Sequence, residues 1–172
     1  MTERDFYHDE ATRSAFLGKS ALDLCQLSSE QVQEIYDQRG IGIPVLVSST
    51  LLYLHRFGAM TLADIARALM QPHQLIAQRI DKLIRLKLVR RKADPRDGRR
   101  FELHLTKKGR EQAARLSDCM DDMAIVYGAL YREIECDLPQ KLNDACDALA
   151  EKPLSVRFEE MFGDGKVERI HG

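Results

Sequence analysis

The sequence lacks any run of about 18 apolar residues, the length that a membrane-spanning helix requires. Its first segment, residues 1–16, is acidic, whereas a secretory signal begins with basic residues and continues into an apolar stretch. We therefore expect neither a membrane span nor a cleaved signal, and we predict a cytoplasmic protein.

Cysteine and histidine are few and scattered along the chain. No CxxC pair occurs among the 4 cysteines, which are Cys25, Cys119, Cys136 and Cys146. In a reducing compartment such thiols are expected to be free and mostly buried. The 5 histidines do not stand at the spacing of metal ligands, so neither a metal site nor a cofactor is predicted.

The common sequence motifs of catalysis are missing as well. The chain has no glycine-rich phosphate loop, no nucleophile elbow and no HExxH pair. Isolated serine, histidine and aspartate residues occur in any chain of this length and do not indicate a catalytic group. An enzyme is therefore not expected, and the function has to be sought in binding.

Positive charge is concentrated in one short segment, although the net charge is only −1. Residues 79–110 carry 13 basic and 4 acidic residues, whereas residues 1–78 carry 6 and 9 and residues 111–172 carry 7 and 14. A surface that is merely solvated mixes both signs. A concentrated basic segment is typical of a surface that binds phosphate groups.

Hydrophobic periodicity predicts two helices before the basic segment. An apolar stripe from Leu17 to Ile35, with steps of three and four residues, indicates one long amphipathic helix. Pro44 then opens a helix over residues 45–57 that is apolar on nearly all sides, and Gly58 ends it. The second helix should therefore lie in the core.

Two shorter helices follow. Thr61 is expected to cap a helix over residues 62–69, with Asp64 at a spacing close to that of a capping box. After a short turn, Pro72 opens a helix that runs to about Leu86.

A hairpin is predicted after these helices. Residues 88–92 and 100–105 resemble strands, and the loop between them, residues 93–99, is rich in turn-forming and charged residues. The order of helix, helix, turn, helix and hairpin defines a winged helix-turn-helix. The expected fold class is mainly α with a small β-hairpin wing.

The segment after the hairpin is predicted to be helical. Thr106 is expected to cap a long helix whose apolar residues follow steps of four and three, which indicates a helical dimer seam. A short helix between Pro139 and Pro153 follows, and its end leaves a tail of residues 152–172.

These elements suggest one domain over residues 1–172. Within it, residues 44–110 form the winged helix, and residues 10–39 and 111–151 form dimerisation helices. The dimer interface is expected to include apolar residues of both terminal helices: Leu17, Leu24, Leu116, Met120, Met123, Tyr127 and Leu130. The alternative is that such residues pack only within their own chain.

The helix over residues 72–86 has two distinct faces at 100° per residue. Its apolar residues fall on one side, and Gln74, Gln78, Asp81 and Arg85 fall on the other. A glutamine amide both donates and accepts hydrogen bonds, which matches the edge of adenine. We predict that His73, Gln74 and Gln78 read bases, and that Lys82 and Arg85 contact phosphates of double-stranded DNA.

The hairpin carries a dense cluster of cations. Because like charges repel at this distance, an anionic partner is expected for Arg91, Lys92, Arg96, Arg99 and Arg100. Two acidic residues lie among them, Asp94 and Asp97, and are predicted to brace the arginines and cap the turn. A merely solvated loop is the alternative.

Several motifs together resemble the MarR family. They are TLADIARAL at residues 61–69, DKL at 81–83, LVRR at 88–91, DPRDGR at 94–99 and LTKKG at 105–109, within a resemblance over residues 44–116. Two positions depart from the usual pattern. Lys87 stands where the family often has glycine, and Gln71-Pro72 replaces the usual serine or threonine at the start of the recognition helix.

The resemblance implies a homodimeric regulator, more commonly a repressor, that binds a pseudo-palindromic operator and places Arg96 or Arg99 in the minor groove. It also implies release by a small phenolic or lipophilic ligand, or by cysteine oxidation, for which Cys25 is the candidate. Residues near the family's ligand pocket are Tyr36, Tyr53, His55, Arg56 and Met60, although such residues are also common in a core. A winged helix that contacts another protein is a further alternative.

Overall fold

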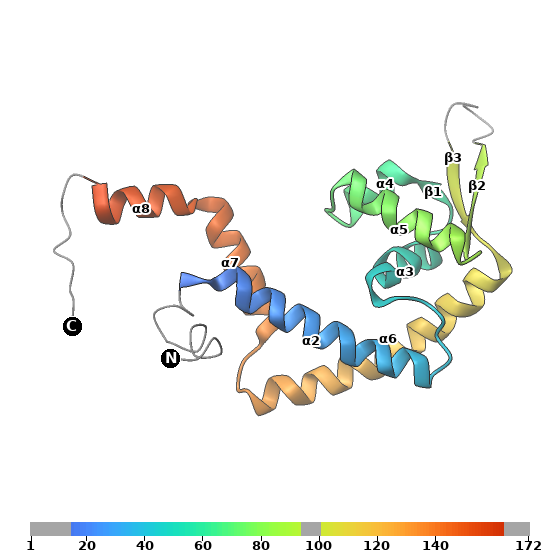
Figure 1. Cartoon of the computed structure of the whole chain (residues 1–172), viewed down its shortest axis with the longest axis horizontal. Coiled ribbons are helices and arrows are strands. Elements are labelled where there is room, and N and C mark those ends of the chain that lie inside the picture. The colour runs from blue at the N-terminus through green and yellow to red at the C-terminus, as the bar shows by residue number, and fades with distance from the viewer. Residues whose placement is uncertain (1–14, 94–100, 164–172) are drawn as a thin grey trace, which may run out of the picture. The chain divides into compact units, whose positions relative to one another are not determined.

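The computed structural model describes residues 15–93 and 101–163 of the chain. Helices dominate this part, and three short strands form one antiparallel sheet (Figure 1). The predicted mainly α fold with a small hairpin is therefore confirmed. None of the described helices has the length and apolar character needed to cross a membrane.

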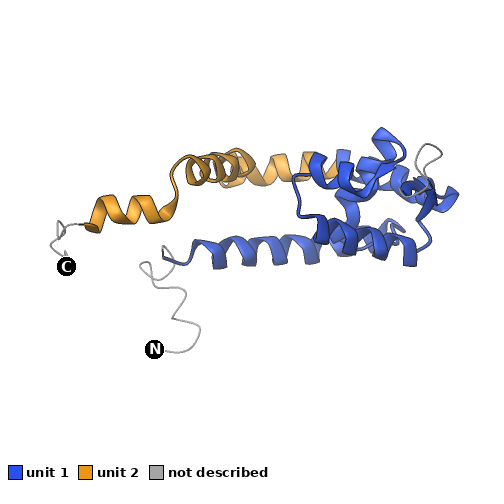
Figure 2. Cartoon of the chain, turned by 90° about the horizontal axis from the view of Figure 1, so that it is seen from above, with its two compact units in different colours: residues 1–121 blue, residues 122–172 orange. Residues whose placement is uncertain are grey.

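The chain divides into two compact units, residues 1–121 and residues 122–172 (Figure 2). The boundary falls inside the long helix α6, which runs from Lys107 to Glu133. The winged helix lies entirely within the first unit.

The first unit contains the elements that the hydrophobic pattern predicts, with small shifts at their ends. In chain order they are α2 (Leu17–Gln38), η1 (Val45–Val47), α3 (Ser48–Phe57), β1 (Met60–Thr61), α4 (Leu62–Ala68), α5 (His73–Arg85), β2 (Val89–Ala93), β3 (Phe101–Leu105) and the start of α6. The strand order is β1-β3-β2. The two-residue strand β1 was not predicted, because it is too short to show an alternating pattern.

A capping box starts α4, as the sequence predicts. The backbone N–H of Asp64 donates to the Thr61 hydroxyl at 3.2 Å, and the backbone N–H of Thr61 donates to the Asp64 carboxylate at 3.4 Å. The Thr61 hydroxyl also donates to this carboxylate at 2.6 Å. These hydrogen bonds, together with Arg67, lower the pKa of Asp64 from its ordinary value of 3.8.

In the part of the chain that the structure describes, three helices are followed closely by a left-handed residue that is not glycine. Met70, Lys87 and Glu135 have φ of 49°, 60° and 50°. At Lys87 two backbone hydrogen bonds close the end of α5, from Lys87 N–H to the Ile84 carbonyl at 2.8 Å and from Leu88 N–H to the Leu83 carbonyl at 2.9 Å. This is a Schellman closure, whose left-handed position favours glycine over other residues.

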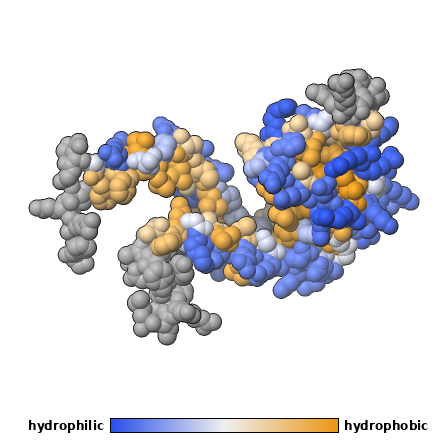
Figure 3. Space-filling view, turned by 45° about the horizontal axis from the view of Figure 1, so that its top comes forward, coloured by the Kyte–Doolittle hydropathy of each residue, from blue (hydrophilic) through white to orange (hydrophobic). Residues whose placement is uncertain are grey.

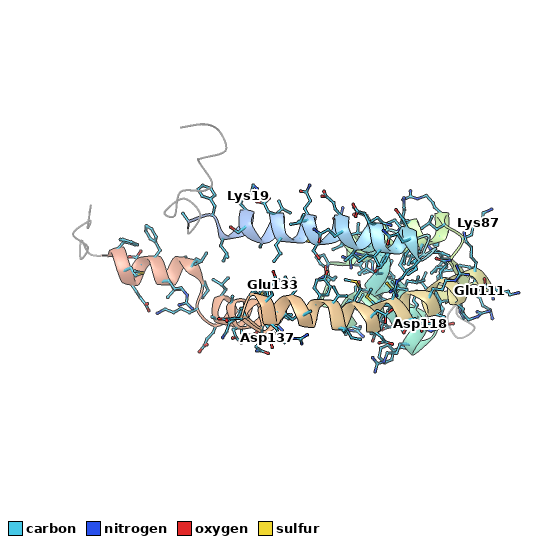
Figure 4. The ribbon with its side chains drawn as sticks, turned by 90° about the horizontal axis from the view of Figure 1, so that it is seen from below. Lys19, Lys87, Glu111, Asp118, Glu133 and Asp137 are labelled. Atoms are coloured by element: carbon cyan, nitrogen blue, oxygen red, sulfur yellow. The ribbon has the colours of Figure 1, made fainter. Side chains whose placement is uncertain are left out.

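The end of α5 is joined directly to the start of α6. The Thr106 hydroxyl donates to the Lys87 carbonyl at 2.8 Å and accepts from the Gly109 backbone N–H at 3.0 Å. The Thr106 backbone N–H donates to the Leu88 carbonyl at 2.9 Å. Thr106 therefore caps α6, as predicted, and also ties it to the turn after α5. Lys87 is labelled in Figure 4 at this end of the first unit.

The two helices that follow α6 in the second unit are amphipathic but contain no buried residue. They are α7 (Leu138–Glu151), which begins with an Asp137 cap and a proline in its first turn, and α8 (Leu154–Phe162). The segment expected to be a tail thus contains a helix, whose start was obscured by Pro153. Apolar surface runs along these helices (Figure 3), and it includes Leu142, Leu149, Leu154, Val156, Phe158, Met161 and Phe162.

Part of the predicted dimer seam is already buried within the isolated chain. Leu116 is 0% exposed and Met123 is 6% exposed, and Met120 is half-buried. Leu116 and Met123 pack within their own chain and are not free to contact a second copy. The other seam residues stay half-buried or exposed in the isolated chain: Leu17, Leu24, Tyr127 and Leu130.

We predict that Gly109→Ala strongly destabilises the protein. A Cβ atom at this position would lie 2.0 Å from the Leu88 carbonyl oxygen, a backbone atom that cannot move without displacing β2. The expected loss is about 2–4 kcal/mol, as for other severe overpacking, measured by thermal and denaturant unfolding. The control is Gly18→Ala on α2, where nothing lies within 4 Å of the new Cβ. An unchanged midpoint for Gly109→Ala contradicts the proposed close contact.

We also predict a pH-dependent contribution from Asp64. Because its pKa is lowered in the folded state, the stabilisation is complete above the ordinary value of 3.8 and is lost as pH falls through the folded pKa. Asp64→Asn should therefore lower the free energy of unfolding at pH 7 by about 0.5–1 kcal/mol, with a lower unfolding temperature. The difference in stability between Asp64→Asn and the wild type should vanish in strong acid. Asp118→Asn on α6 is the control. A difference that persists in strong acid contradicts this origin.

Candidate nucleic-acid interface

Helix α5 lies over the core of the winged helix with its apolar face inward. Ile76, Ile80 and Leu83 are all 0% exposed, and they pack in the same core as Leu51 and Ile65. The burial of each such side chain contributes about 1.5–3 kcal/mol, which fixes the rotation of the helix about its axis. The polar face is consequently held toward solvent.

The three predicted base-reading residues are exposed in the first half of α5. His73, Gln74 and Gln78 all have solvent-accessible side chains, and none forms a hydrogen bond with another described side chain. Pro72 occupies the N-cap position and provides no side-chain cap. The departure from serine or threonine seen in the sequence therefore leaves the first turn of α5 without the usual hydroxyl.

The polar row of α5 continues toward the C-terminal end of the helix. Lys82 and Arg85 are exposed in its last turns, and their contacts with phosphate groups stay a prediction. Asp81 lies in the same row, and Arg91 of β2 donates from Nη2 to its Oδ1 at 2.8 Å. This ion pair joins the recognition helix to the first strand of the wing. The sequence placed Asp81 on this face but did not indicate its partner.

Successive side chains of β2 point to opposite faces of the sheet. Arg91 is the cross-strand partner of Leu103, on the face toward α5, whereas Lys92 is paired with Glu102 on the other face. Glu102 in turn lies 3.0 Å from His104 Nε2. Of the two predicted wing cations in β2, Arg91 is thus held by an acid of α5 and Lys92 faces away from that helix.

The remaining wing residues lie outside the described residues. They are Asp94, Arg96, Asp97, Arg99 and Arg100, so their predicted contacts with DNA and with one another stay predictions.

Residues proposed for an effector pocket are spread over three elements. The Tyr36 hydroxyl is buried and lies 3.0 Å from Ser48 Oγ at the start of α3. Near the end of α3, Tyr53 and Arg56 contact the Phe57 ring. His55 is exposed in the same helix, and Met60 lies in β1. Tyr36 is therefore a core residue with a hydrogen-bond partner, and the pocket stays a prediction.

The four cysteines differ in exposure. Cys119 is buried and Cys136 is half-buried, whereas Cys25 and Cys146 are exposed. The expectation that the cysteines are mostly buried is wrong for Cys25 in the isolated chain, because α2 buries only Val32 and Tyr36. Within the described residues, no group of three potential metal-ligating side chains is present.

Comparison with known proteins gives one family match and several similar folds. The family model described as MarR family matches residues 41–100. No curated protein matches the sequence. A MarR transcriptional regulator from Methanosarcina mazei Go1 has a TM-score of 0.56 and 21% identity, and the match covers 83% of this chain and 99% of that chain.

Two further solved structures have the same fold. Reduced AbfR bound to DNA has a TM-score of 0.52 and 22% identity, with 74% of this chain and 95% of that chain covered. A probable transcriptional regulator from Pseudomonas aeruginosa has a TM-score of 0.50 and 21% identity, and the match covers 65% of this chain and 94% of that chain. At these identities the likeness establishes the fold. The family match itself is confined to residues 41–100, which hold the winged helix up to the loop after β2.

Proposed function

We propose that this protein is a homodimeric, sequence-specific DNA-binding regulator of transcription. It acts as a repressor on a pseudo-palindromic operator and is released by a small lipophilic or phenolic ligand. The observation that carries the proposal is the polar row of α5, in which Gln74, Gln78 and Arg85 are exposed beside the basic strand β2.

This row has the chemistry that major-groove recognition requires. The groove admits an α-helix, and a glutamine amide can both donate to and accept from the edge of adenine. Lys82 and Arg85 provide positive charge one to two turns further along the same helix. Phosphate contacts from these residues set the register, and the glutamines supply the preference for sequence. The similar fold of a DNA-bound regulator supports this orientation.

A second copy would cover apolar residues that the isolated chain leaves exposed. Leu17 and Leu24 on α2 are 61% and 41% exposed, and α7 buries no residue. A helix as short as α7, with 14 residues, is marginally stable in water without a packing partner. Dimerisation through the terminal helices accounts for both features and places two recognition helices on one DNA duplex.

The signal that releases the DNA has two candidates. A lipophilic ligand is the first, and oxidation of Cys25 is the second, favoured by the exposure of this thiol on α2.

The first experiment selects binding sites from a random duplex library with the purified protein. We expect an inverted repeat whose half-site centres lie about 10 base pairs apart. Gln74→Ala and Gln78→Ala should change the preferred bases and weaken binding to the selected site by about 5- to 100-fold, with little effect on unrelated DNA. Gln26→Ala on α2 is the matched control. Absence of any enriched sequence would falsify sequence-specific binding.

A second experiment tests whether the pair of Asp81 and Arg91 orients the wing. Removing an acid near DNA should tighten binding if only charge matters. If the pair holds β2 against α5, Asp81→Ala should instead weaken binding about two- to fivefold, since an exposed ion pair contributes up to about 1 kcal/mol. The measurement is fluorescence anisotropy with a labelled operator. Asp118→Ala on α6, labelled in Figure 4, controls for the charge change. Tighter binding by Asp81→Ala would overturn the orienting role.

A further inference from the structure

Arg79 occupies an unusual position on the recognition helix. It lies neither in the apolar face nor in the polar row, and its side chain is half-buried against α3. Its Nη1 donates to the Ser49 hydroxyl at 3.5 Å, at the start of α3. Its Nε is buried and has no hydrogen-bond partner among the described residues.

The cation is poorly compensated within its own chain. No carboxylate of the described residues forms an ion pair with Arg79, although other arginines have one, such as Arg67 with Asp64 at 3.2 Å. A buried donor without a partner disfavours the folded state. An apolar side chain beside Ile76 and Ile80 would satisfy folding better than a guanidinium group. Folding alone therefore does not explain this residue.

Arg79 lies on the side of α5 that is opposite the wing. Asp81 is two positions further along the helix, which corresponds to a rotation of about 200° around the helix axis. Asp81 pairs with Arg91 of β2 and so marks the wing side. A helix in the major groove has a phosphate backbone on each side of it. The wing lies beside one backbone, and Arg79 is on the flank that faces the other.

We propose that Arg79 and Ser49 bind a backbone phosphate of DNA on the side of the recognition helix away from the wing. The inference rests on the proposed function and adds a contact to it. The guanidinium and the hydroxyl both donate to an oxyanion, and the exposed ammonium of Lys82 lies one turn further along this flank. Since a phosphate oxygen carries no base identity, this contact strengthens binding to all sequences.

The test compares Arg79→Met with the wild-type dimer on the selected operator and on an unrelated duplex. Methionine keeps much of the length of the side chain and removes the charge and the buried Nε. We expect weaker binding to both duplexes, by about five- to tenfold per protomer near 0.1 M salt, and a salt slope that is smaller by about one per protomer. The unfolding temperature should stay the same or rise, because the unpaired donor is gone.

Two variants make the comparison specific. Arg132→Met removes an exposed arginine from the second unit and should leave the salt slope unchanged. Arg79→Lys keeps the charge and should retain most of the slope. If Arg79→Met lowers the unfolding temperature and leaves the slope unchanged, Arg79 only positions α3, and the phosphate contact is overturned.

The same donors can bind a free oxyanion. Inorganic phosphate at constant ionic strength distinguishes the two sources. If it raises the unfolding temperature of the wild type but not of Arg79→Met, while both bind DNA with equal slopes, the site belongs to a small anion and the DNA contact is overturned. Failure of the wild type to bind any duplex overturns the proposed function as well, and this result is visible without the variant.

Discussion

The close approach of α6 to the backbone of Leu88 is the constraint on which the winged helix depends. Gly109 leaves room for the Leu88 carbonyl, and Thr106 hydrogen bonds to the carbonyl of Lys87 and caps α6 with the same hydroxyl. Three segments thus meet around Leu88 and Thr106. They are the end of α5, the start of β2 and the first turn of α6. A rotation of α6 against α5 has to break these hydrogen bonds, which therefore restrain the angle between the two helices near this joint.

Forces of different size set the position of the recognition helix. The buried face, with Ile76, Ile80 and Leu83, contributes several kcal/mol and determines which side faces the core. The exposed pair of Asp81 and Arg91 contributes at most about 1 kcal/mol. The free energy of this ion pair is therefore too small to determine the position of α5 on the core, but it can adjust the angle of the wing. Stability and the proposed DNA contact are consequently separable, since residues of the polar row add little to the core.

Local patterns made much of this structure predictable. The two faces of α5 follow from helical periodicity, and the Thr61–Asp64 cap needs only residues three apart. The pair of Asp81 and Arg91 was not predictable, because it depends on how the wing folds back onto α5. The left-handed backbone at Met70 and Lys87 was not predictable either, because neither position is occupied by glycine. Leu116 belongs to a stripe that looks the same in sequence whether its own chain or a second copy covers it.

The second unit would link folding to association if the protein forms the proposed homodimer. Neither α7 nor α8 buries a residue, although both have an apolar side. Short amphipathic helices gain most of their stability from a packing partner and little from the backbone alone. If a second copy provides that partner, the stability of these helices depends on protein concentration. The winged helix has its own core and does not share this dependence. In the proposed homodimer, dilution should therefore loosen the terminal helices first and separate the two copies of α5 while each winged helix remains folded.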